Sequence, residues 1–154
     1  MIDNYDVETL DKNTVIFVKG EPSTELILIK KGWVRVFEET KSSLHFIGKR
    51  EQGSYLGEHS MLKDNATRRL TSITSEECEI IRVPYKDLNT IIKDGPEWLP
   101  EIIKVILMRS QDIHTLVLQH RLDDNIEILS DDLIHELRDI VLNYRELKGL
   151  SLDS

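Results

Sequence analysis

The chain changes character at Pro84, and this change limits what it can fold into. Before Pro84, short segments rich in β-branched and aromatic residues alternate with turn residues, a pattern typical of an all-β sandwich or barrel. After Pro84, apolar residues recur at helical spacing. We therefore predict a mainly β fold with C-terminal helices, whose strands are Thr14 to Val18, Leu26 to Lys30, Trp33 to Glu38, Leu44 to Gly48, Arg69 to Ser75 and Cys78 to Val83.

Three helices are predicted after the strands: Tyr85 to Lys93, Trp98 to Leu122, and about Asp131 to Lys148. The middle helix carries an apolar seam with a polar residue at its centre, which predicts a partner helix and a homodimer. The residues of this seam are Leu99, Ile103, Ile106, Ser110, Ile113, Val117 and His120.

The last helix has Ser130 as its predicted N-cap and ends before Gly149. Its own seam is formed by Leu133, Leu137, Ile140, Tyr144 and Leu147. That seam fits the long helix or its copy in a second chain. The chain then divides into a β-roll with a short helix (1–97), the long helix (98–122) and a helical extension (123–154).

Composition limits the partners. The 154 residues are 40% hydrophobic and 31% charged, which is enough to form one folded domain. With 28 acidic and 20 basic residues the net charge is -8, so we expect no direct DNA binding. The single cysteine favours a reducing cytoplasm, and no apolar segment is long enough to predict a membrane span.

The sequence contains no recognisable catalytic or metal-binding pattern. Its histidines (His45, His59, His114, His120 and His135) have none of the spacings that bring metal ligands together. Cys78 lies in an apolar strand, which predicts a buried structural thiol. We expect no metal and no enzyme activity, and a metal-dependent cupin-like enzyme is disfavoured for the same reason.

The segment from Gly53 to Thr71 has the features of an anion site. Gly57 permits close backbone approach, and His59 to Leu62 can form one helical turn with free N–H groups. A guanidinium and these N–H groups would hold a phosphodiester, while a carboxylate is better suited to a ribose hydroxyl. A glycine-rich turn with solvated charges is the alternative. The candidate nucleotide-binding residues are Gly57, Glu58, His59, Ser60, Arg68 and Arg69.

Four segments in order resemble the cyclic nucleotide-binding domain family, which includes the catabolite activator protein, the regulatory subunits of protein kinase A and cyclic-nucleotide-gated channels. They are Asn13 to Pro22, Leu28 to Val36, Gly53 to Glu58 and Cys78 to Pro84, within a resemblance that covers about residues 8–122. The resemblance implies a double-stranded β-helix, or jelly roll, with flanking helices. It also implies cAMP or cGMP as the ligand.

The resemblance does not decide which arginine faces the phosphate. Arg68 keeps the family spacing to Glu58, whereas Arg69 has the more family-like continuation through Leu70 and Thr71. Alternation along a strand lets only one of them face inward. His59 is a departure, since an apolar residue usually follows the glutamate in the family. By resemblance, the long helix near Arg109, Ile113 and His114 would cap the base.

The sequence thus predicts a cyclic nucleotide sensor that signals through its long helix and dimer contacts to an unknown downstream protein. The alternative is a roll that binds no nucleotide and serves as a dimeric interaction module. The chain after Leu122 carries one predicted helix, so we expect no helix-turn-helix in it.

Overall fold

The computed structural model describes residues 4–61, 63–120 and 128–151, with the backbone alone described for residues 111–120. All strands precede the first α-helix, as the sequence predicts, and a short 3-10 turn lies among the strands. The strands are β1 (Val7–Leu10), β2 (Val15–Phe17), β3 (Glu25–Lys31), β4 (Trp33–Glu39), β5 (Leu44–Glu51), β6 (Tyr55–Leu56), β7 (Thr71–Thr74) and β8 (Cys78–Pro84). The helices are the 3-10 turn η2 (Glu58–Ser60), α1 (Tyr85–Asp94), α2 (Leu99–His120) and α3 (Asp131–Lys148).

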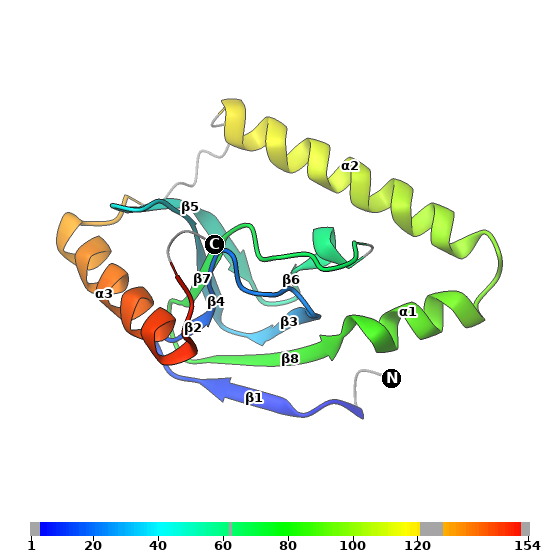
Figure 1. Ribbon diagram of the computed structural model, residues 1–154, viewed down its shortest axis with the longest axis horizontal. Helices are drawn as coiled ribbons and strands as arrows, with labels where there is room; N and C mark the ends of the chain where they lie inside the picture. The colour runs from blue at the N-terminus through cyan, green and yellow to red at the C-terminus, as the bar shows by residue number, and fades with distance from the viewer. Residues whose placement is uncertain (1–3, 62, 121–127, 152–154) are drawn as a thin grey trace.

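The strands form two antiparallel sheets that face each other as a jelly roll (Figure 1). One sheet has the strand order β1-β8-β3-β6 and the other β2-β7-β4-β5. Both sheets contribute to one apolar core, which includes Phe17 of β2, Ile27 and Ile29 of β3, Val34 of β4 and Ile80 of β8. This core fixes the roll that carries the candidate site.

All six predicted strands and all three predicted helices are present, whereas β1 and β6 were not predicted from the sequence. β1 is mostly exposed and β6 has only two residues, so neither carries a readable apolar alternation. Tight turns account for the left-handed backbone at Asn13 (φ 59°) and Gly32 (φ 80°).

α3 packs against the β2-β7-β4-β5 sheet of its own chain, so the prediction that its seam packs along the long helix or that helix's copy in a second chain was wrong. Leu137 and Val141 are fully buried in a cluster with Phe37 and Ile73 of that sheet and with Val18, which follows β2. Each such apolar side chain contributes about 1.5–3 kcal/mol on burial. Leu147, the last residue of the predicted seam, is 87% exposed. α3 is therefore part of the folded domain.

The α3 boundaries follow its caps. The Ser130 side chain accepts a hydrogen bond from the Leu133 N–H at 3.3 Å, and Gly149 ends the helix at φ 65°. Both were predicted from the sequence.

α2 leaves α1 at the end of the roll opposite α3 (Figure 1) and contacts η2. Of its predicted seam, Leu99, Ile103 and Ser110 are half-buried while Ile106 is 57% exposed. The side chains of Ile113, Val117 and His120 lie outside the described residues. No helix in the described part of the chain is long and apolar enough to cross a membrane.

Candidate functional site

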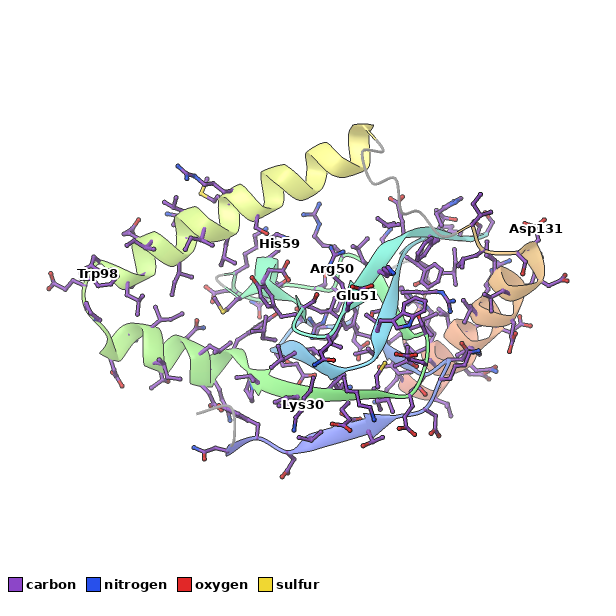
Figure 2. All side chains as sticks on the ribbon, turned by 180° about the vertical axis from the view of Figure 1, so that it is seen from behind. Lys30, Arg50, Glu51, His59, Trp98 and Asp131 are labelled. Atoms are coloured by element: carbon purple, nitrogen blue, oxygen red, sulfur yellow. The ribbon has the colours of Figure 1, made fainter. Side chains whose placement is uncertain are left out.

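An open pocket lies beside η2, where β6 ends and the chain returns toward β7. In Figure 2, α2 passes above the turn that carries His59. The pocket is lined by Phe17, Val36, Arg50, Tyr55, Leu56, Gly57, Glu58, His59, Ser60, Arg68, Arg69 and Leu70. The site residues predicted from the sequence thus all lie at one place.

Gly57 is required by its surroundings. It begins η2 with φ 95° and ψ 3°, a conformation that side chains rarely adopt. A Cβ here would lie 2.8 Å from the Tyr85 hydroxyl and 2.9 Å from the Glu25 carbonyl oxygen, and it would also collide with Nη1 of Arg68. The glycine lets the turn approach the arginine closely.

Arg68 is a buried cation with incomplete pairing. Its side chain is on the pocket wall, the residue is 5% exposed, and its guanidinium lies over the Phe17 ring at 4.3 Å. Nη2 donates to the Glu25 carbonyl at 3.0 Å, but Nε and Nη1 have no hydrogen-bond partner among the described residues. Burial lowers the pKa of the guanidinium, because desolvation disfavours its charge. Such a group is suited to an anion.

The structure distinguishes the two arginines that the sequence left open. Arg68 is buried, whereas Arg69 is exposed at the pocket rim. β7 begins at Thr71 rather than at Arg69, because residues 66–68 pair instead with the turn after β2. Strand periodicity therefore did not apply to either arginine.

Glu58, His59 and Ser60 form η2. The helical turn is thus present after Gly57, but it spans Glu58–Ser60 rather than the predicted His59 to Leu62. A Glu58 Oε1 to His59 Nε2 contact of 3.2 Å joins the two half-buried side chains, and Ser60 is buried. Glu58 supplies the acceptor oxygens on this side of the pocket.

Tyr85 is a supporting residue that sequence reasoning missed. Its hydroxyl donates to the Gly57 carbonyl and lies 2.9 Å from the Ser23 hydroxyl. Since Tyr85 is the first residue of α1, it connects the pocket turn to the helices. The position after Pro84 marked a helix start but gave no signal of this role.

Cys78 and Arg109 are not among the residues that line the pocket. Cys78 is buried, and burial raises the pKa of its thiol. Arg109 is exposed on α2, while the side chains of Ile113 and His114 are outside the described residues. Among the residues that the structure describes, no three His, Cys, Asp or Glu side chains are grouped to hold a metal ion.

The fold and the site together define a jelly-roll domain in which a glycine-led turn faces a buried arginine. The sequence profile of the cyclic nucleotide-binding domain family matches residues 7–94, more than half of the chain. The chain belongs to that family. No curated protein sequence matches it.

Solved structures share the fold at low identity. The c-di-GMP responsive global regulator CLP of Xanthomonas campestris has a TM-score of 0.64 and 17% identity, over 77% of this chain and 58% of that one. The catabolite activator protein of Thermus thermophilus has a TM-score of 0.63 and 21% identity, over 77% and 55%. The cGMP-bound EAL enzyme Bd1971 has a TM-score of 0.60 and 18% identity, over 74% and 30%. The chain thus spans less than two thirds of each of these proteins.

Proposed function

We propose that this chain is a cyclic nucleotide sensor, binding cAMP or cGMP in the pocket beside η2 and signalling without catalysis. Arg68 carries the proposal, because it is 5% exposed while two of its guanidinium nitrogens have no partner within the described structure. Within the described structure Arg68 forms no direct ion pair with a counter-charge, and a buried cation of this kind costs several kcal/mol. A cyclic phosphate would supply that charge.

The sugar is assigned to the other side of the pocket. Glu58 lies next to Gly57 and is half-buried, so its carboxylate accepts hydrogen bonds from a ligand hydroxyl without full solvent competition. The ribose 2′-hydroxyl beside the cyclic phosphate is such a donor. His59 already contacts this carboxylate at 3.2 Å, and a bound ribose would share it.

Transmission runs through α2 in this proposal. α2 contacts η2, and Tyr85 joins the Gly57 carbonyl to the start of α1. A nucleotide that fixes this turn would favour one position of the α1–α2 pair through contacts made only in that state. The fold of the EAL enzyme Bd1971, solved both with cGMP and with cAMP bound, supports a ligand of this class.

Calorimetric titration with cAMP and with cGMP tests the proposal. We expect one of them to bind with micromolar affinity or tighter, about -8 kcal/mol. Arg68→Lys should weaken binding about tenfold or more, because a point charge cannot form the same paired hydrogen bonds. The matched control, Arg69→Lys, should bind as the native chain does.

The contrary outcome is also specific. The proposal would be contradicted if the protein, folded and free of copurified nucleotide, bound neither cAMP nor cGMP. The chain would then act as an interaction module that keeps the roll without the ligand.

A further inference from the structure

The turn between β2 and β3 lies between two parts of the chain that are distant in sequence. We call residues 18–23 the strap. On one side the strap meets the segment that carries Arg68, and on the other it meets the C-terminal helix α3. Any displacement of the strap therefore changes both contacts.

The strap is hydrogen-bonded to the backbone of Arg68 itself. The Arg68 N–H donates to the Glu21 carbonyl at 2.7 Å, and the Gly20 N–H donates to the Arg68 carbonyl at 2.8 Å. The Ser23 N–H donates to the Ala66 carbonyl at 2.8 Å. Since no regular strand includes Arg68, these bonds hold its backbone in place.

α3 holds the same strap from the other side. The Tyr144 hydroxyl lies 3.0 and 3.1 Å from the two carboxylate oxygens of Glu21. One of these oxygens also accepts from the Val18 N–H at 3.1 Å, which closes the turn. Arg145 Nη2 donates to the Lys19 carbonyl at 2.8 Å. Burial and the charge of Glu21 raise the pKa of Tyr144, so the phenol keeps its proton and donates.

A second connection ends at β7, just beyond the arginine. Arg145 is 4% exposed and forms a paired ion contact with Glu39, with two N–O distances of 2.7 Å. Glu39 also accepts from the Thr71 hydroxyl at 2.7 Å, and that hydroxyl in turn accepts from the Lys19 N–H at 3.0 Å. α3 is therefore linked by two routes to the segment that contains Arg68, one through the strap and one through Glu39 and Thr71.

We propose that α3 positions Arg68, with Tyr144 and Arg145 acting as positioning residues through the strap and Glu39. The nature of the anion rests on the proposed function, whereas the coupling of α3 to Arg68 does not. Because coupling between two sites is reciprocal, an anion bound at Arg68 stabilises the docked α3. A partner that removes α3 from the roll would weaken nucleotide binding.

Amide hydrogen exchange of the ligand-free protein tests the coupling. Tyr144→Phe removes the hydroxyl and keeps the ring, so the domain stays folded. We expect the Gly20 and Arg68 amides to exchange about fivefold faster or more. The Ile29 and Thr74 amides, bonded to Ser54 and Thr14, should not change. The control Leu147→Ala alters the 87% exposed face of α3 and should leave all four amides unchanged.

Nucleotide titration supplies the second measurement. We expect Tyr144→Phe to weaken cAMP or cGMP binding about fivefold or more, and Leu147→Ala to leave it unchanged. In an Arg68→Lys background the same substitution should have a much smaller effect, because both changes act on one group.

The exchange and titration measurements each have a result that would overturn the inference. Equal acceleration of all four amides, or no acceleration, would overturn the coupling of α3 to Arg68, as would unchanged nucleotide affinity in Tyr144→Phe. If the native chain binds neither nucleotide, the proposed function fails, and the exchange of the Gly20 and Arg68 amides alone decides this inference.

Discussion

At the scale of single residues, Arg68 combines burial with unused hydrogen-bond donors. Replacing it with an apolar side chain of similar length removes a buried charge that has no direct ion pair in the described structure. We predict that Arg68→Met raises the free energy of unfolding by about 1 kcal/mol while abolishing nucleotide binding. Urea denaturation without ligand measures the first effect. Arg69→Met, at an exposed position, should stay within about 0.5 kcal/mol of the native value.

The sign of this change is informative. If Arg68→Met instead lowered the free energy of unfolding by about 1 kcal/mol or more, contacts with Glu25 and Phe17 would already compensate the charge in the free protein. Arg68 would then need no ligand.

Gly57 gives a second prediction at the residue scale. Gly57→Ala should lower the free energy of unfolding by about 3 kcal/mol, combining a strained φ with collisions against Tyr85 and Glu25. Gly53→Ala is the matched control, since φ there is 84° but no atom lies within 4 Å of the added Cβ. Gly53→Ala should lower the free energy of unfolding by about 1 kcal/mol. Equal losses in the two variants would contradict the close packing at Gly57.

The sequence located the turn of the candidate site and two candidate arginines, Arg68 and Arg69, but could not choose between them. Gly57 and Glu58 follow from residue type and spacing, whereas Arg68 lies in a segment held by cross-chain backbone bonds rather than in a strand. Alternation therefore could not choose between Arg68 and Arg69. Tyr85 was missed because its hydroxyl acts on a residue 28 positions away.

At the scale of elements, the Arg145–Glu39 pair attaches α3 to the roll. We predict that Arg145→Met lowers the free energy of unfolding by about 3–5 kcal/mol, because it leaves the buried carboxylate unpaired. Arg138→Met, which removes one exposed contact of the same helix with the Lys41 carbonyl, should cost about 0.5 kcal/mol or less.

Adding Glu39→Met to Arg145→Met separates charge from packing. The double variant should recover at least half of the free energy of unfolding that Arg145→Met loses, since neither charge of the pair remains buried. Thermal or urea unfolding of all variants checks this. No recovery would show that Arg145 acts by packing alone.

Helix boundaries and strong strands could be predicted because caps, turns and apolar periods are local. The strands β1 and β6 could not, because they are held by pairing with β8 and β3 rather than by their own pattern. The docking of α3 was open for a similar reason. Its seam fits any apolar face, and its specific partner Glu39 lies 106 residues away.

At the scale of the whole molecule, α2 presents an apolar face away from the roll. The exposed side chains of this face are Ile102, Val105, Ile106 and Met108 of α2 together with Trp98 just before it, with exposures of 47–59%. Figure 2 places Trp98 at the far end, where α1 meets α2. A helix with such a face is stabilised by a partner helix.

We predict that the chain is a homodimer through this face, which shares only Ile106 with the seam predicted from the sequence, since Leu99 and Ile103 of that seam are half-buried in the monomer. Light scattering coupled to gel filtration should give twice the monomer mass for the native chain and the monomer mass for Ile106→Glu, because a charge at that position opposes burial. Leu147→Glu, on the exposed side of α3, should leave the dimer intact. A monomeric native chain would contradict this assignment.

The central claim is that the Arg68 guanidinium binds the phosphate of a cyclic nucleotide. Nuclear magnetic resonance of the Arg68 Nε–H group, assigned by its loss in Arg68→Lys, observes that contact directly. We predict a large shift of this resonance on adding cAMP or cGMP, and none with adenosine or guanosine, which lack the phosphate. Nucleotide binding that leaves the Arg68 resonance in place, or an equal shift with the nucleoside, would contradict the account.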